Sequence, residues 1–283
     1  MNVDYHVHTS FSNDCAYPME EAVRDAIALG LDEICFTEHV DYGILTDAED
    51  TKEIRYRAGG PNDPLQMPML NVDYPRYIAQ VQRMRGEYGN RIEIRTGLEY
   101  GVQTHTMPQY RRLAQRYPMD FVILSIHQIG DLEFWNGEYM EGKTQDEYIA
   151  GYYDEMLATA EAFTDYSVLG HIGMIERYDA NGPYPFEKIK PVMEQILRRV
   201  ISDGKGIEVN TSCFRYNLRD ITPAVPVLRL YRQLGGRILT LGSDTHKKEH
   251  LGAHMAKVRG MLRDMGFEEF CTYRAMEPVF HRL

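Results

Sequence analysis

Strand-like and helix-like runs alternate along this chain of 283 residues. Seven runs have the β-branched and apolar character of strands: Val3–His8, Glu33–Thr37, Ile92–Glu99, Phe121–Ser125, Ser167–Gly170, Gly206–Asn210 and Arg237–Leu241. Several of them, such as Phe121–Ser125, are continuously apolar, which suits parallel strands that helices cover. Repeated strand–helix units of this kind fold either into a closed barrel or into an open doubly wound sheet.

The stretches between the strands carry helix signals. We expect helices over residues 18–29, 74–88, 146–163, 186–201, 222–234 and about 253–265. Pro18 followed by two glutamates is a favourable helix start. Gly235 and Gly236 end the helix that Thr222 and Pro223 open. No domain boundary is evident in the sequence, so residues 1–283 are predicted to form a single barrel domain.

Histidines and carboxylates recur directly after the predicted strands. His6 and His8 occupy alternate positions of the first strand and therefore project from the same face. Similar residues follow later strands: His39, Glu99, His127, His171, Asp244 and His246. One strand-end histidine is usually a hydrogen-bonding residue, but its recurrence along the chain is hard to explain in that way. Because strand ends converge at one mouth only in a closed barrel, this distribution favours closure.

Imidazole and carboxylate groups together are suitable ligands for zinc, manganese or iron. A zinc-like ion takes about four ligands, some of them water. The number of candidates therefore indicates a cluster of two to three divalent metal ions rather than one.

Composition and charge narrow the function classes. The net charge of −11 makes a broad basic face for nucleic acid unexpected, although a few arginines and metal ions could hold a small anionic substrate. The scattered cysteines Cys15, Cys35, Cys213 and Cys271 form no C-x-x-C pair and are expected to be reduced thiols of a cytoplasmic protein. No signal peptide and no membrane-spanning segment are expected.

The candidate residues fall in a recognisable order: His6-x-His8, Glu38-His39, Glu99, Ser125-x-His127, Gly170-His171 and Asp244-x-His246. In this order, and across nearly its full length, the chain resembles the polymerase-and-histidinol-phosphatase (PHP) superfamily. Residues 37–42, 97–101, 171–178 and 210–215 look most like the histidinol-phosphate phosphatases within it. The resemblance implies an α/β fold, a distorted (β/α)7 TIM-like barrel with a trinuclear metal centre.

The resemblance also implies a role for each candidate. The first ion would be held by His6, His8, Glu99 and Asp244, the second by Glu99 as a bridge with His127 and His171, and the third by Asp14, His39 and His246. The residues expected to take part in catalysis are Glu99, Asp244 and His246. Arg177 and Arg215 lie a few residues beyond strand ends, and the resemblance assigns them to substrate phosphate, with surface ion pairing as the alternative.

The function that these residues imply is metal-dependent hydrolysis of a phosphomonoester. Metal ions generate a hydroxide nucleophile near neutral pH and take up charge on the phosphoryl oxygens. The expected substrate is L-histidinol phosphate, an intermediate of histidine biosynthesis. A phosphodiesterase or exonuclease on the same scaffold, a phosphatase for another small phosphorylated metabolite, and a noncatalytic metal-binding domain are the alternatives.

Four further features have open interpretations. Residues 41–72 are irregular and form either a lid over the active face or a variable surface excursion. Gly173 stands where many relatives have Asp, a carboxylate that would orient His171. His105 is either a proton donor for the leaving group or a solvated loop histidine. Cys213 and Arg219 match the C-x5-R spacing of cysteine-dependent phosphatases, but no glycine lies between them, so the match is interpreted as chance.

Overall fold

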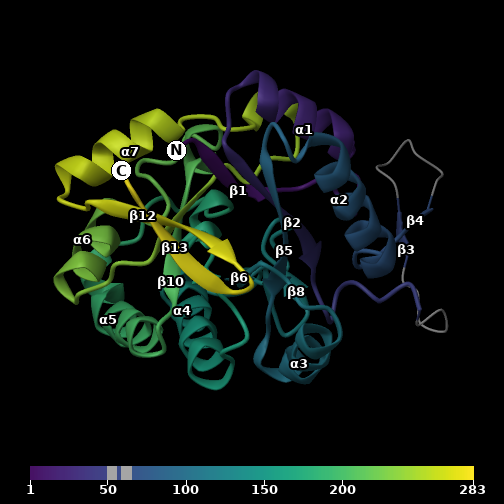
Figure 1. Ribbon diagram of the computed structural model, residues 1–283. Helices are drawn as coiled ribbons and strands as arrows, with labels where there is room; N and C mark the ends of the chain where they lie inside the picture. Colours follow the sequence, from purple (N-terminus) through teal and green to yellow (C-terminus); the bar gives the residue numbers. More distant parts are fainter. Residues whose placement is uncertain (50–55, 59–65) are drawn as a thin grey trace.

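A computed structural model describes residues 1–49, 56–58 and 66–283. At its centre are seven parallel strands in the order β1-β2-β5-β6-β9-β10-β11 (Figure 1). Their bounds are Val3–Val7 (β1), Glu33–Val40 (β2), Glu93–Gly101 (β5), Phe121–Ser125 (β6), Val168–Leu169 (β9), Gly206–Asn210 (β10) and Leu239–Gly242 (β11). Each overlaps a run predicted as a strand.

The sheet closes on itself between its first and last strands. The His8 amide donates to the Thr245 carbonyl at 2.8 Å, and the Thr245 amide donates to the His6 carbonyl at 3.1 Å. The pairing of β1 with β2 shifts register between Asp4 and Val7. The predicted distorted barrel of seven strands is therefore confirmed.

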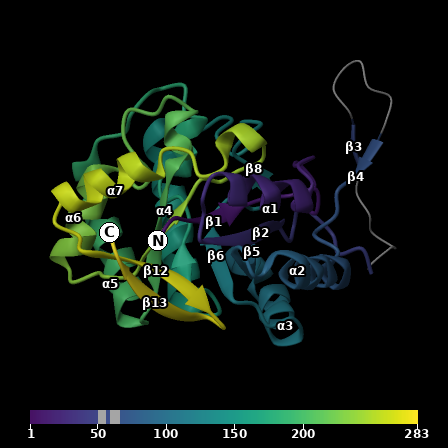
Figure 2. The same ribbon diagram turned by 45° about the horizontal axis from the view of Figure 1, so that its top comes forward.

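Helices surround the barrel (Figures 1 and 2). They are Met19–Ala28 (α1), Tyr74–Tyr88 (α2), Met107–Arg116 (α3), Gln145–Ala162 (α4), Phe186–Ser202 (α5), Val225–Gln233 (α6) and Met255–Asp264 (α7). Short 3₁₀ helices span Thr104–Thr106 (η1), Met174–Arg177 (η2), Thr211–Phe214 (η3) and Lys248–His250 (η4). None of the described helices is both long and apolar enough to cross a membrane.

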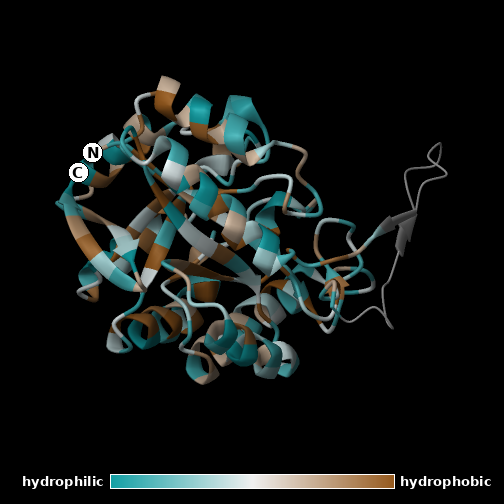
Figure 3. Cartoon of the chain, turned by 45° about the vertical axis from the view of Figure 1, so that its right-hand side comes forward, coloured by the Kyte–Doolittle hydropathy of each residue, from teal (hydrophilic) through white to brown (hydrophobic). Residues whose placement is uncertain are grey.

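The helices are amphipathic, and their buried faces complete the core around the apolar strands (Figure 3). In α5 the buried residues include Ile189, Met193 and Ile196, at spacings of four and three residues. The helix α3 was not expected from the sequence. Its signals are Pro108 in its first turn and the buried Met107, Tyr110 and Leu113 at intervals of three.

A C-terminal hairpin of β12 (Glu269–Arg274) and β13 (Glu277–Arg282) covers the floor of the barrel, where the strands begin. The Tyr273 amide donates to the Tyr5 hydroxyl at 2.8 Å, and the Tyr273 hydroxyl donates to the Ser167 carbonyl at 3.2 Å. The hairpin was not predicted, because its turn, Ala275-Met276, adopts positive φ values without glycine or asparagine.

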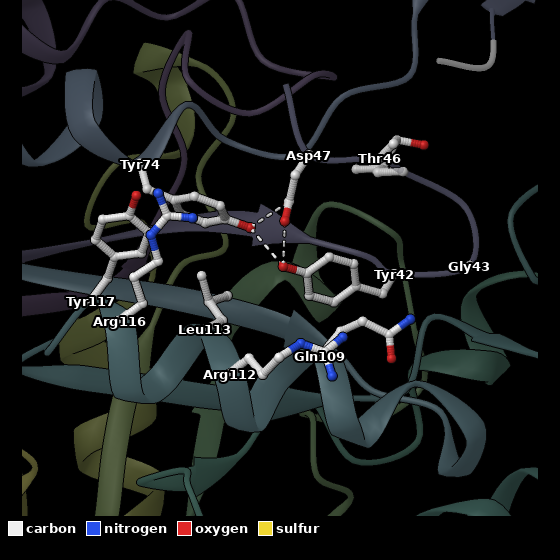
Figure 4. Close-up of a pocket in the computed structure, with 11 residues that line it drawn as sticks. Tyr42, Gly43, Thr46, Asp47, Tyr74, Gln109, Arg112, Leu113, Arg116 and Tyr117 are labelled. Carbon is white, nitrogen blue, oxygen red and sulfur yellow. Dashed lines mark hydrogen bonds between the residues drawn. The ribbon is translucent and has the colours of Figure 1, made fainter. Parts of the chain in front are cut away.

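The remaining strands form two small hairpins, β3 (Tyr56–Ala58) with β4 (Gln66–Pro68) and β7 (Gln128–Ile129) with β8 (Leu132–Glu133). The first belongs to the predicted lid or surface excursion, of which residues 50–55 and 59–65 lie outside the described residues. The beginning of that stretch is anchored on α2. The hydroxyls of Tyr42 and Tyr74 donate to Asp47 at 2.8 and 2.9 Å (Figure 4).

Candidate metal centre

The carboxyl ends of the strands bring the predicted ligands together at the mouth of the barrel. His6 lies on β1 and His8 directly follows it, His39 lies on β2, and Glu99 lies on β5. The segments after β6, β9 and β11 supply the others: His127, His171, Asp244 and His246. A cavity of about 640 Å³ opens above this group.

Glu99 lies in the middle of the group and is fully buried. Its Oε2 atom is 3.0 Å from His6 Nε2, 3.3 Å from His8 Nε2 and 3.1 Å from His39 Nδ1. Its Oε1 atom is 2.7 Å from His171 Nε2 and 3.1 Å from His127 Nε2. The two oxygens thus face two different sets of nitrogens, which is the arrangement of a carboxylate that bridges two ions.

Two of the imidazoles that face Glu99, those of His6 and His127, are held from the far side of their rings by other carboxylates. The Nδ1 atom of His6 lies 2.5 Å from the Glu208 carboxylate, and that of His127 lies 2.7 Å from Asp41, so each Nδ1 carries its proton there. When these rings are neutral, as in a metal complex, their opposite Nε2 atoms carry lone pairs aimed at a carboxylate. The Nε2 atoms of His6 and His8 are also only 3.0 Å apart. Lone pairs in such positions call for a cation between them, and imidazole with carboxylate suits a divalent metal.

In the metal-free protein, neighbouring carboxylates shift the pKa values of two buried histidines, His6 and His127. Burial lowers the pKa of His6 and His127, but Glu208 and Glu99 outweigh it at His6, and Asp41 and Glu99 do so at His127. The pKa of each is therefore raised well above its ordinary value. In the folded protein these extra protons occupy the positions that a metal would take, so metal binding must displace them.

His8 differs from these two histidines. Burial holds its pKa well below the ordinary value, and the charges of His39 and His246 lower it further. Its Nδ1 atom lies 3.2 Å from the Ser12 hydroxyl, which in turn donates to Glu38 at 2.6 Å. His8 is thus a neutral imidazole, the form that binds metals.

A third set of donors lies at the rim. His246 Nε2 is 3.4 Å from His39 Nε2 and 3.3 Å from Asp14 Oδ2, and Asp14 Oδ2 is 3.6 Å from His39 Nε2. Burial would raise the pKa of Asp14, but His39 and His246 lower it overall. The residues expected to hold a third ion are therefore neighbours, with the half-exposed Asp14 nearest to solvent.

Both predicted arginines line the same cavity. Arg177, at the end of η2, is buried and donates from Nη2 to Asp244 Oδ2 at 3.0 Å and to the Ser212 hydroxyl at 2.6 Å. Arg215 follows η3 and donates to the carbonyls of Ser243 and Asp244, each at 2.6 Å. Neither is engaged in a surface ion pair.

Several residues that hold the site in place were missed from the sequence. Glu208 points into the barrel and accepts from the His171 amide at 2.8 Å as well as from His6. It stands between the apolar Ile207 and Val209, and this buried charge in an apolar strand was the available signal. Gly101 leaves room for the Asp41–His127 pair, since a Cβ atom there would lie 1.8 Å from Asp41 Oδ1.

The structure also shows the surroundings of the other residues singled out from the sequence, His105, Cys213 and Gly173. His105 is exposed and lies 3.1 Å from Asp131, away from the cavity. Cys213 is buried, and burial raises its pKa, as expected of a packed thiol rather than a nucleophile. Gly173 has a φ of +95°, a conformation that favours glycine, and among the described residues His171 Nδ1 has no hydrogen-bond partner.

Comparisons with known proteins agree with this fold and site. A family model of the PHP domain matches residues 4–212. Histidinol-phosphatase of Lactococcus lactis subsp. lactis (strain IL1403) is 31% identical over 283 residues, covering 97% of this chain and 95% of that protein. Histidinol-phosphatase of Bacillus subtilis (strain 168) is 24% identical over 234 residues, covering 75% and 81%.

A solved structure extends the similarity to three dimensions. The crystal structure of histidinol phosphate phosphatase from Lactococcus lactis, complexed with zinc, L-histidinol and phosphate, aligns with a TM-score of 0.80. The alignment has 30% identity and covers 98% of each chain. This chain belongs to the PHP domain family, and within it to the histidinol-phosphatases. The donor set at its mouth is a site for divalent metal ions.

Proposed function

We propose that this protein is a metal-dependent phosphatase that hydrolyses L-histidinol phosphate to L-histidinol and phosphate. The observation that carries the proposal is the group of imidazoles around Glu99, whose lone pairs face one another as in a metal centre. The Lactococcus lactis relative, which has the same fold, binds zinc, L-histidinol and phosphate.

In this proposal the centre holds two to three ions of zinc, manganese or iron. The ligands of the first would be His6, His8, Glu99 and Asp244, those of the second Glu99, His127 and His171, and those of the third Asp14, His39 and His246. Divalent ions in such a centre activate water near neutral pH and stabilise charge on a phosphoryl group. Glu99, Asp244 and His246 are the ligands that we place nearest to the reacting atoms.

The protein's own groups orient the centre and the substrate. Glu208 and Asp41 hold the Nδ1 protons of His6 and His127, which keeps both Nε2 atoms turned inward. Arg177 and Arg215 stand at the cavity beside Asp244 and would bind the phosphoryl oxygens. A small phosphorylated metabolite is therefore the expected partner.

We also propose that residues 1–283 act as one barrel domain in the cytoplasm. The packing of the C-terminal hairpin against Tyr5 supports a single unit. All four cysteines are free, and three of them are buried, which suits a reducing compartment.

The test is phosphate release from L-histidinol phosphate by the zinc-loaded protein, with bis(p-nitrophenyl) phosphate as the diester control. We expect rapid monoester turnover that His8→Ala abolishes and that His105→Ala leaves unchanged. Diester cleavage with little monoester turnover would instead favour a phosphodiesterase. Turnover of neither by protein that binds zinc would refute histidinol phosphate as the substrate.

A further inference from the structure

The turn after β11 carries two of the proposed ligands, Asp244 and His246, in an unusual backbone conformation. Asp244 has a φ of +57°, in the left-handed region that is unfavourable for residues with a Cβ atom. Such a conformation persists only where the surroundings hold it. The contacts around this turn therefore determine where both side chains point.

Arg215 holds the turn from one side through its backbone. Its Nη1 atom donates to the Ser243 carbonyl and its Nη2 atom to the Asp244 carbonyl, each at 2.6 Å. Its guanidinium also lies 3.5 Å from Asp244 Oδ2. A planar guanidinium can span two successive carbonyls in this way, whereas the single ammonium of lysine cannot.

The carbonyl that Arg215 binds is shared with His246. His246 Nδ1 lies 3.0 Å from the Asp244 carbonyl, so this nitrogen carries a proton and Nε2 is turned toward His39 and Asp14. A shift of that carbonyl would move the Asp244 carboxylate and the His246 ring together. Arg215 thus acts on two proposed ligands through one backbone group.

Asp4 holds the same turn from the opposite side. Its Oδ1 atom accepts from the Ser243 amide at 2.9 Å, and its Oδ2 atom accepts from the Ser243 hydroxyl at 2.5 Å. Asp4 is fully buried on β1, two residues before His6. With the amide of Ser243 held by Asp4 and the carbonyls held by Arg215, the turn is fixed from both sides.

Arg177 has a different relation to Asp244. It contacts the side chain of Asp244 rather than its backbone, and its other partner is the Ser212 hydroxyl. Its Nε atom is buried and has no partner among the described residues. The hydrogen bonds of Arg177 to Asp244 and Ser212 thus do not reach the backbone of the turn, whereas Arg215 uses one N–H of each terminal nitrogen to hold a carbonyl of that backbone.

We propose that Arg215 is a positioning residue of the metal centre, which presents Asp244 and His246 to metal by holding the backbone of their turn. This role is separate from any contact of Arg215 with phosphate. It rests on the proposed function only in taking Asp244 and His246 as metal ligands.

Zinc titration of the metal-free protein tests the proposal without any substrate. We expect Arg215→Lys to weaken zinc binding by about 10- to 100-fold, as is usual when a group that orients a ligand is lost. Arg177→Lys keeps a positive charge beside Asp244 and leaves the backbone of the turn held, so it should weaken zinc binding less than Arg215→Lys does and should raise KM for L-histidinol phosphate. Arg219→Lys, a change of an exposed arginine in the same loop, is the matched control and should alter neither quantity.

Kinetics at saturating zinc provide a second readout. Arg215→Lys should lower kcat more than it raises KM, because substrate still binds while Asp244 and His246 are displaced. If Arg215→Lys bound zinc with unchanged affinity and only KM rose, Arg215 would be a phosphate ligand alone and the proposal would be wrong.

A guanidinium rescue experiment covers the case in which Arg215→Lys folds poorly. Arg215→Ala leaves space for a free guanidinium ion, so millimolar guanidinium chloride should restore part of the zinc affinity, whereas sodium chloride should not. Absence of this difference would overturn the proposal. If the protein binds zinc as expected but releases no phosphate from L-histidinol phosphate, the substrate assignment fails and the role of Arg215 stands.

Discussion

At the floor of the barrel the hydroxyl of Tyr5 and the carboxylate of Glu33 are bonded to groups of the protein itself, whereas at the mouth the carboxylate of Glu99 faces a cluster of imidazoles. On the floor, the Tyr5 hydroxyl donates to Glu33, and Arg95 Nε donates to the same carboxylate at 2.7 Å. At the mouth, each oxygen of Glu99 faces one imidazole, His6 or His127, whose opposite nitrogen is already bonded to another carboxylate. Both regions are buried, and both belong to the same seven strands.

The difference shows which end depends on something outside the chain. A buried polar group with a complete set of partners costs little, whereas one without them costs free energy of unfolding. The Tyr5–Glu33 pair at the floor is bonded entirely to the protein's own groups, since the C-terminal hairpin brings the amide of Tyr273 to Tyr5. The mouth becomes complete only with extra protons or with metal ions. The floor therefore contributes mainly stability, and the mouth contributes function.

The strongest test of this contrast is Glu99→Gln. An amide cannot bridge two ions as a carboxylate does, and its NH₂ group would face the imidazoles. We expect phosphatase activity to fall at least about 100-fold, as for loss of a central electrostatic group, while the circular dichroism spectrum stays unchanged. Glu93→Gln, at the exposed start of the same strand, is the control and should keep full activity. Near-normal activity of Glu99→Gln would contradict the bridging role.

Removal of metal from the mouth should lower the stability of the whole protein. A ligand at 100 to 1,000 times its Kd stabilises a protein by about 2.7–4.1 kcal/mol. For a chain of this size, chelation should lower Tm by roughly 5–15 °C. Scanning calorimetry with and without a chelator measures the difference.

The difference in Tm between metal-loaded and metal-free protein should increase with pH. In the metal-free protein the pKa values of His6 and His127 are raised despite burial, because of Glu208, Glu99 and Asp41. Their stabilisation is fully present below about pH 6.5, the ordinary pKa of histidine, and is lost as pH rises through the raised values. The Tm gap between metal-loaded and metal-free protein should therefore widen from about pH 6 to about pH 9. A gap independent of pH would show that no protons replace the metal.

Gly101→Ala should weaken metal binding at the mouth of the barrel without replacing any proposed metal ligand. Its Cβ would lie 1.8 Å from Asp41 Oδ1 and 2.8 Å from His127 Nδ1, so the pair between them must separate. We expect zinc affinity to fall about 10- to 100-fold. Gly86→Ala in α2 is the matched control. It has open space around its Cβ position, and it should stabilise the fold by about 0.5–1 kcal/mol with unchanged zinc binding.

Tyr5→Phe tests the floor and should have the smallest effect on function. Without the hydroxyl, the Tyr273 amide and the Glu33 carboxylate each lose a buried partner. The expected cost is about 1–3 kcal/mol of unfolding free energy in urea titration. The activity of the folded protein at room temperature should not change. A loss of zinc affinity would mean that the two ends of the barrel are coupled.

Together with the family resemblance, the sequence was sufficient for the seven strands of the barrel and for the list of candidate ligands, but it missed the helix α3 and the C-terminal hairpin. Local sequence patterns are enough to identify the continuously apolar strands. They also show residues at alternate positions of a strand end, such as His6 and His8. Parallel strands then bring their carboxyl ends to one edge, which explains why residues as distant as His6 and His246 could be assigned to one site.

Only the tertiary structure decided what surrounds these residues. Glu208 and Asp41 orient His6 and His127 through contacts across 202 and 86 positions of the chain. The C-terminal hairpin depends on a turn without glycine, and Arg215 proved to bind backbone carbonyls of a turn 28 and 29 positions away. Such pairings depend on which side chains closure of the barrel brings within reach, and no periodic pattern in the sequence encodes that.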